Sequence, residues 1–166
     1  MLLLLTIATV ADAQQGLSTE IQAWANVRLA TPSSGWDPGR NGGGIAVGIR
    51  KTLTGNFLAS VSGEMGAAGI GNYLALKAGA GMPLEWGASR WVYTPELHVL
   101  QGMALARPDP LYMWGLEQTH AIDVRLKDQS GPGLVIGLRF YGFPGYSEFS
   151  PIRSFFDLKA GLRYTF

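Results

Sequence analysis

The two histidines are the side chains of this 166-residue chain best suited to acid–base chemistry. His98 lies two positions after Glu96, so both side chains would share a face of a strand. A histidine beside a carboxylate can transfer protons in catalysis, and it can equally belong to a buried polar network. We expect a network, because a filled interior gives a substrate no access.

The composition gives little support to other kinds of chemistry. The absence of cysteine excludes a disulfide framework, a thiolate metal site and a cysteine nucleophile. Acidic residues alternate with bases, so no metal site is expected, and a net charge of +1 gives no electrostatic reason to bind nucleic acid. The run Asn41–Gly44 precedes a predicted strand rather than a helix, so we interpret it as a flexible loop, not a phosphate cradle. No cofactor is expected.

The elements that must position these residues are strands. From Glu20 to Leu29 the even-numbered residues are polar or aromatic and the odd-numbered ones are apolar, a period of two that predicts a strand. Seven further segments alternate in the same way, and most reach the roughly ten residues that a tilted strand needs to cross a membrane. Pro95, inside the fifth segment, predicts a bulge or a local irregularity, because proline donates no ladder hydrogen bond.

The N-terminal residues 1–13 have the pattern of a secretory signal peptide. An apolar run from Leu2 to Ala11 leads into the small-x-small sequence Ala11-Asp12-Ala13. The run is shorter than the roughly 20 apolar residues of a transmembrane helix. We expect cleavage before Gln14 and one barrel domain over residues 14–166. A short apolar strand or buried helix is the alternative for the N-terminal segment.

The expected connections between strands fall into two classes. The first, third, fifth and seventh lie near residues 31–44, 66–72, 104–115 and 142–154, and all but the one at 66–72 are long. The second, fourth and sixth, near residues 52–55, 83–90 and 128–132, are shorter than those three. Outer-membrane barrels have long loops outside the cell and short turns in the periplasm. This arrangement would place both termini on the periplasmic side.

The segment Phe156–Phe166 resembles the C-terminal strand of bacterial outer-membrane barrels, with apolar residues at every second position and a terminal aromatic residue. Together with the signal peptide and the strand count, the chain resembles the small OmpA/OmpX-type class. The resemblance implies an all-β, eight-stranded antiparallel up-and-down transmembrane β-barrel in contact with outer-membrane lipid. It also implies that the barrel-assembly machinery recognises the strand ending in Tyr164 and Phe166. A soluble periplasmic barrel with its apolar face inward is the alternative.

The polar face of the strands supplies the candidate site. An eight-stranded barrel is just wide enough for side chains to fill, and buried charges are tolerated only when they are paired. Acids and bases are nearly balanced on this face, to which Glu117 also belongs. The predicted interior charged network is Glu20, Arg28, Arg50, Glu64, Lys77, Glu96, His98, Asp123, Arg125, Arg139, Asp157, Lys159 and Arg163.

The enzymatic alternative depends on His120. We expect its side chain on the lipid-facing side of its strand, nearer the outer end, where a site acting on lipid would belong. The following residues are Ala121 and Ile122, so the His-x-Ser arrangement of lipid A deacylase barrels is absent. An interfacial histidine near the headgroups is the preferred interpretation.

Aromatic residues indicate where a partner could bind. Trp36, Tyr112, Trp114 and Tyr146 fall in the expected long loops, where aromatic side chains anchor either a protein interface or the membrane surface. The leading hypothesis is an outer-membrane barrel with a structural or surface-interaction role, no catalysis and an unidentified surface or envelope protein as partner. A hydrolase of lipid A or phospholipid acyl groups and a small pore are the alternatives.

Overall fold

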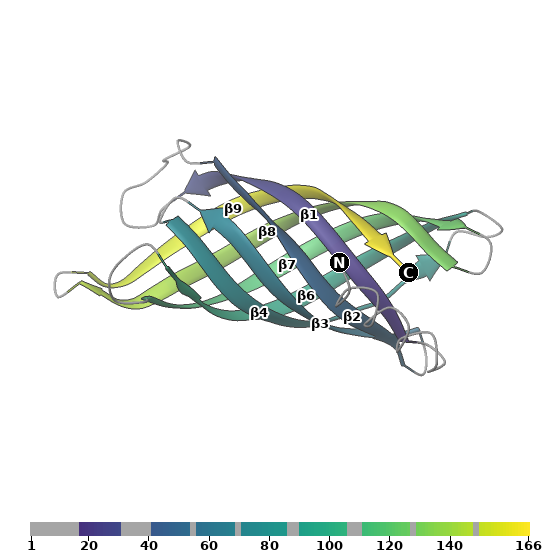
Figure 1. Cartoon of the computed structure of the whole chain (residues 1–166), viewed down its shortest axis with the longest axis horizontal. Helices are drawn as coiled ribbons and strands as arrows, with labels where there is room; N and C mark the ends of the chain where they lie inside the picture. The colour runs from purple at the N-terminus through teal and green to yellow at the C-terminus, as the bar shows by residue number, and fades with distance from the viewer. Residues whose placement is uncertain are drawn as a thin grey trace, which may run out of the picture.

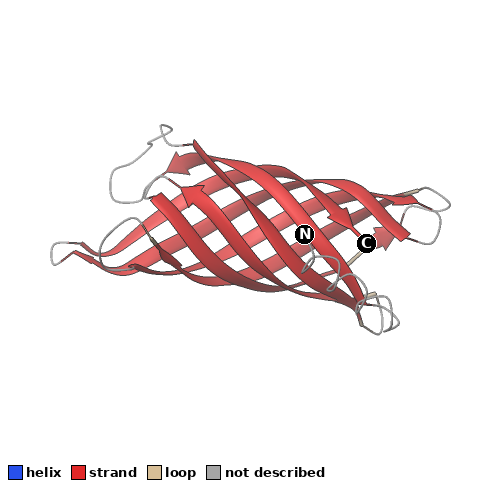
Figure 2. Ribbon diagram, in the orientation of Figure 1, coloured by secondary structure: helices blue, strands red, loops and turns tan. Residues whose placement is uncertain are grey.

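The computed structural model of the chain is a barrel of long, tilted strands (Figures 1 and 2). It describes residues 17–30, 41–53, 56–68, 71–85, 90–105, 111–126, 129–147 and 150–166. The predicted signal peptide and Trp36 lie outside these residues. Within them, no helix has the length and apolar character needed to cross a membrane.

Eight long strands form the wall of the barrel. They are β1 (Leu17–Ala30), β2 (Asn41–Thr52), β3 (Leu58–Ala68), β4 (Gly71–Gly81), β6 (Trp91–Ala104), β7 (Leu111–Leu126), β8 (Gln129–Ser147) and β9 (Ser150–Thr165). A two-residue strand, β5 (Leu84–Glu85), pairs with β6. All pairings are antiparallel, and β1 with β9 and β4 with β6 close the sheet on itself. The predicted eight-stranded antiparallel up-and-down barrel is confirmed.

The alternation along each strand separates a buried polar face from an exposed apolar one. In β7, Glu117 and Asp123 are buried, whereas Leu116 and Ile122 are 47% and 42% exposed. Side chains of successive strand residues point to opposite faces, so the polar set fills the barrel and the apolar set covers its outside. A soluble barrel of the lipocalin kind has the opposite arrangement.

The two ends of the barrel are named by what they carry. The terminal end is the one at which β1 begins and β9 ends, and the hairpin end is the opposite one. At the hairpin end β8 and β9 form a hairpin that extends beyond the neighbouring strands (Figure 1).

The predicted boundaries of the long loops are wrong, because the strands extend further than the alternation suggested. Strand β2 already begins at Asn41, β7 begins at Leu111, and the β8–β9 pairing continues to Ser147 and Ser150. In the extended hairpin the rings of Tyr141 and Phe155 stack inside the barrel with centroids 5.3 Å apart. This packing stabilises strand structure in a segment whose composition suggested a loop.

The glycine run at the start of β2 serves close packing rather than flexibility. A Cβ atom on Gly42 would lie 2.0 Å from the carbonyl oxygen of Ala67 on β3 and 2.7 Å from Oδ1 of Asn26 on β1. Only a residue without a side chain fits between these neighbours. The prediction of a flexible loop over Asn41–Gly44 is therefore wrong.

No bulge occurs at Pro95 in the pairing of β6 with β7, which keeps an unbroken register from Trp91 to Ala104. The predicted irregularity lies at the other edge of β6, which is interrupted at this residue. Pairing with β4 stops at Gly81 and pairing with β5 starts at Leu84. Pro95 accepts a hydrogen bond at 3.1 Å from the backbone N–H of Met82, so its missing donor falls at a gap between two partner strands.

Candidate functional site

Charged side chains from all eight long strands fill the interior. Within the described part of the chain, six carboxylates, six basic side chains and His98 are buried: Glu20, Glu64, Glu96, Glu117, Asp123, Asp157, Arg28, Arg50, Lys77, Arg139, Lys159, Arg163 and His98. Equal numbers of acids and bases let each charge find an opposite one, which is the condition for burying them.

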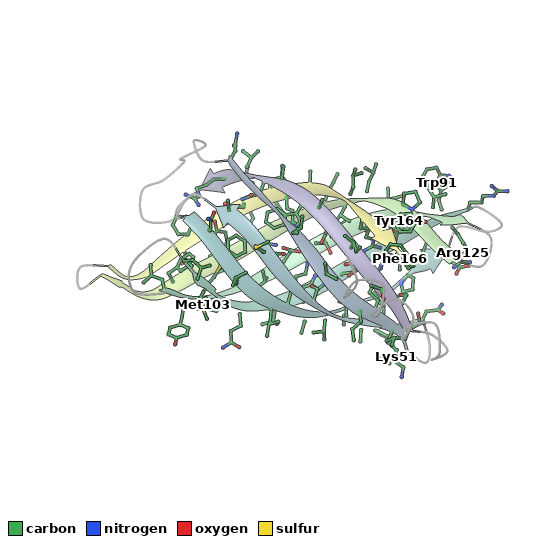
Figure 3. All side chains as sticks on the ribbon, viewed as in Figure 1. Lys51, Trp91, Met103, Arg125, Tyr164 and Phe166 are labelled. Carbon is green, nitrogen blue, oxygen red and sulfur yellow. The ribbon has the colours of Figure 1, made fainter. Side chains whose placement is uncertain are left out.

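Arg125, predicted to belong to this interior, lies outside the network. Its side chain is 46% exposed at the terminal end, where Figure 3 shows it near Phe166, and its Nη2 donates a hydrogen bond at 2.5 Å to Oε1 of Glu85. The β7–β8 register shifts between Asp123 and Arg125, so the alternation that holds for the rest of β7 ends here. The hydrogen bond from Arg125 holds the pKa of Glu85 below its ordinary value.

The middle of the barrel holds a central cluster, formed by Glu64, Lys77, Glu117, Arg139 and Lys159. Arg139 binds both carboxylates: Nε donates to Oε2 of Glu117 at 2.6 Å, and Nη1 and Nη2 donate to Glu64 at 2.6 and 2.8 Å. Lys77 and Lys159 reach the other oxygen of Glu117 at 3.0 and 3.2 Å. The two carboxylates thus share three cations, which ties β3, β4, β7, β8 and β9 together.

Two aromatic side chains complete the central cluster. The hydroxyl of Tyr73 donates to Oε1 of Glu64 at 2.7 Å and accepts a hydrogen bond from Arg139. The ring of Trp24 lies 4.9 Å from Cζ of Arg139 and 4.7 Å from Nζ of Lys159, the geometry of cation–π contacts. Alternation had placed Trp24 and Tyr73 on the polar face, but it gave no sign of these partners.

Toward the hairpin end, Asp157 is held by three neighbours. Asn26 Nδ2 donates to it at 2.6 Å, the hydroxyl of Tyr141 donates at 2.8 Å, and Nε of Arg28 lies 3.6 Å from its other oxygen. The guanidinium of Arg28 also covers the ring of Phe155 at 4.1 Å. Sequence reasoning missed Phe155 because this residue lies between the expected loop, which ended at residue 154, and the expected strand, which began at residue 156.

Toward the terminal end, a terminal cluster comprises Glu20, Arg50, Glu96, Asp123 and Arg163. Arg50 donates to Glu96 at 2.7 Å and lies 3.1 Å from Glu20. Arg163 binds Asp123 through both Nε, at 2.6 Å, and Nη2, and it also contacts Glu96. Every charge of this cluster has an opposite charge beside it.

The His98–Glu96 pair belongs to this network. Nε2 of His98 lies 3.1 Å from Glu96, and the histidine is only 4% exposed. Its ring packs on the backbone of β4, where a Cβ on Gly79 would lie 2.1 Å from Cδ2 of His98. Glu96 is also bound to Arg50 and Arg163 through its other oxygen, so the pair is one part of a larger set of ion pairs.

His120 faces outward with polar neighbours. Its Nδ1 lies 2.6 Å from the hydroxyl of Tyr93, whose ring stacks on it, and its Nε2 lies 3.1 Å from the side-chain nitrogen of Gln118. These two partners are a phenol and an amide, and neither is a carboxylate that could orient the histidine as a base. Because β7 spans Leu111–Leu126, His120 lies slightly nearer the terminal end of the strand than the hairpin end.

The aromatic residues predicted as loop contacts lie in strands where they are described. Tyr112 and Trp114 belong to β7 and are 68% and 42% exposed on the outside of the barrel. Tyr146 belongs to β8, and the structure does not describe its side chain. At the other end, the rings of Tyr164 and Phe166 lie 4.8 Å apart on the outer surface (Figure 3).

No group of three or more histidine, aspartate and glutamate side chains suited to a metal ion occurs among the described residues. The buried acids are bound to arginine and lysine instead. The chemistry of the interior is therefore that of ion pairs and hydrogen bonds.

Comparison with known proteins gives similarity at the level of structure. No family model and no curated protein matches the sequence. The crystal structure of Neisserial surface protein A is similar over 92% of this chain and 98% of that chain, with a TM-score of 0.59 and 13% identity. The N-terminal β-barrel domain of Pseudomonas aeruginosa OprF is similar over 90% of this chain and 97% of that chain, with a TM-score of 0.50 and 10% identity. At such identities the similarity establishes the fold alone: the chain has the fold of these small outer-membrane barrels, a closed barrel of eight long strands.

Proposed function

We propose that the chain is an integral outer-membrane protein with a structural or surface-interaction role and no catalytic activity. The observation that carries this proposal is the segregation of charge into the barrel and of apolar side chains onto its outside. Leu76, Val99, Leu134 and Leu162, from four different strands, are between 59% and 67% exposed. Soluble monomers rarely expose apolar surface so continuously, whereas a membrane barrel needs such a band.

The outer surface supports lipid as the principal partner. A shallow apolar groove of about 510 Å³ lies over Gly63, between Val47, Leu74 and Met103, in the middle of the exposed band. Trp91, Tyr164 and Phe166 are exposed toward the terminal end (Figure 3). Tyr112 is exposed at the start of β7, toward the hairpin end. Aromatic side chains at both ends of an apolar band match the headgroup level of a bilayer.

The interior argues against the two alternative functions. The central cluster fills the middle of the barrel with side chains that are at most 5% exposed, and moving any of them would break ion pairs. A pore would need that path to be open. A lipid hydrolase would need an activated nucleophile, and the described partners of His98 and His120 offer none.

The strand order supports a proposal for orientation and assembly. Strand β9 closes the barrel against β1, and Phe166 donates its backbone N–H to Thr19 at 2.9 Å. Tyr164 and Phe166 thus lie together where β9, the last strand in the sequence, pairs with β1. We propose that both termini lie in the periplasm, where the barrel-assembly machinery would bind this strand.

Four measurements test the proposal. In fractionated cells the chain should be recovered in the outer membrane and should migrate faster on a gel before boiling than after it. The purified barrel should give no stepwise conductance in planar bilayers and no turnover of lipid A or phospholipid. Recovery in the soluble periplasm would contradict the membrane role, and acyl hydrolysis that His120→Ala abolishes would contradict the absence of catalysis.

A further inference from the structure

The terminal end of the barrel opens into a cavity of about 670 Å³. Small-molecule sites commonly have volumes of about 300–1,000 Å³. Its lining includes the hydroxyl side chains of Ser18, Thr94 and Thr165 and the apolar side chains of Leu58, Leu84 and Val92, beside several charged groups. The hydroxyl and apolar parts of this lining suit a ligand that has both kinds of surface.

The charged groups around this cavity are already neutralised. Arg50 binds Glu20 and Glu96, Asp123 is bound on both oxygens by Arg163, and Arg125 binds Glu85. An ionic ligand at Arg50 or Asp123 would have to break a buried pair, which is costly, whereas the Arg125–Glu85 pair is exposed. The buried part of the cavity therefore disfavours phosphate, carboxylate and amine ligands, although Arg50 lines it.

Hydrogen-bonding capacity, in contrast, remains. Thr165 and Arg50 line the cavity and are 2% and 6% exposed, and each keeps a buried polar atom without a partner, Oγ1 and Nε. A buried polar atom without a partner is unfavourable, so such atoms usually mark bound water or a ligand. Neutral hydroxyl groups would satisfy them without disturbing an ion pair.

From these observations we infer that the cavity is a binding site for a neutral carbohydrate of one or two rings. The hydroxyl groups of the sugar would form hydrogen bonds with the threonine and serine side chains, and its C–H face would pack on Leu58, Leu84 and Val92. The inference does not depend on which side of the membrane the terminal end faces.

The direct test is a titration of the refolded barrel in a zwitterionic detergent that carries no sugar head group. With methyl-labelled leucine, valine and threonine, saturable shifts are expected at Leu58, Leu84 and Val92 but not at the outward-facing Leu97 and Val99. The probes are maltose and the disaccharide of N-acetylglucosamine. Whichever disaccharide binds more tightly shows whether the natural ligand comes from a glucan or from an amino-sugar source. Shifts with phosphate or lysine and none with either sugar would overturn the inference.

A matched pair of variants ties binding to the cavity. Thr165→Val removes one hydroxyl and should weaken the sugar about two- to tenfold, the effect of one hydrogen bond. Thr119→Val makes the same change at a residue that is equally buried but does not line the cavity, and it should leave the affinity unchanged. Leu84→Trp should fill the cavity and abolish binding. Equal weakening by both threonine variants, or full binding by Leu84→Trp, would contradict the site. A barrel that reaches the membrane but binds neither sugar would refute this inference alone.

Discussion

At the scale of single residues, the side chain on which most of the interior depends is Arg139. Its guanidinium makes hydrogen bonds to Glu64, Glu117 and Tyr73 and lies over the ring of Trp24. Arginine suits this position because its planar fork can bind two carboxylates at once and can stack on an aromatic ring. Removing it would leave two carboxylates with only the two lysines to neutralise them.

We therefore expect Arg139→Met to be strongly destabilising. Breaking a buried pair by removing one partner costs about 3–5 kcal/mol, because the remaining charge stays buried. Unfolding by urea in phospholipid vesicles, followed by gel mobility, measures the change. The control is Arg125→Met, which breaks an exposed pair with Glu85 and should change stability little. Similar losses in both variants would mean that the central cluster does not depend on Arg139.

The sequence predicts which residues face inward better than it predicts their partners. The structure places every member of the predicted network except Arg125 inside the barrel. Alternation predicts the inward-facing residues because it shows which face of a strand each side chain occupies. It does not predict pairs across the barrel, such as Glu64 with Arg139, which are 75 residues apart and on strands that are not neighbours.

At the scale of the strands, glycines decide how large side chains fit into a narrow barrel. The ring of Trp24 extends from β1 over Gly44 of β2 and Gly66 of β3 toward Tyr73 of β4, with ring centroids 6.4 Å apart. A Cβ on Gly66 would lie 2.8 Å from Cη2 of Trp24 and 2.8 Å from the hydroxyl of Tyr73. The position of Trp24 therefore requires small residues two strands away.

Gly66→Ala and Gly63→Ala form a matched test of this packing. Both substitutions add one methyl group to β3, but Gly63 faces outward and its Cβ would meet nothing within 4 Å. Overpacking costs about 1–3 kcal/mol, so Gly66→Ala should lower the free energy of unfolding by that amount. Gly63→Ala should be neutral or slightly stabilising, by at most about 1 kcal/mol. Vesicle unfolding of both proteins measures the difference, and equal stabilities would show that Trp24 can move aside.

Strand extent is the feature that alternation predicted least well. The segments at 41–44 and 142–154 were interpreted as loops because glycine and proline usually mark turns. In this barrel glycine is instead the residue that permits close approach of neighbouring strands, and Tyr141 and Phe155 pack inside the extended hairpin. One signal in the sequence could have revealed the hairpin. The alternation of inward-facing and outward-facing positions continues past the predicted ends of the strands, and it places these aromatic residues on the inward-facing side.

At the scale of the whole molecule, the barrel has the reverse of the usual arrangement around a hydrophobic core: its charged side chains lie inside and its apolar side chains cover the outside. Closure of the sheet by β4 with β6 leaves no open edge among the eight long strands. The apolar side chains on the outside gain free energy only where the surroundings are also apolar. The fold class could be predicted from sequence because strand number, alternation and the final aromatic residue all agree with this design.

The dependence on an apolar environment can be measured with one charge placed at two depths. Leu76 lies at the middle of β4 and is 67% exposed, whereas Leu53 follows β2 at the terminal end and is 48% exposed. In a bilayer an outward-facing arginine costs about 2–4 kcal/mol at the midplane and about 0–1 kcal/mol near the interface. We expect Leu76→Arg to reduce the stability of the folded barrel in phospholipid vesicles by the larger amount and Leu53→Arg by the smaller. Equal and small costs at the two positions would mean that this surface faces water, and would contradict a barrel that spans a membrane.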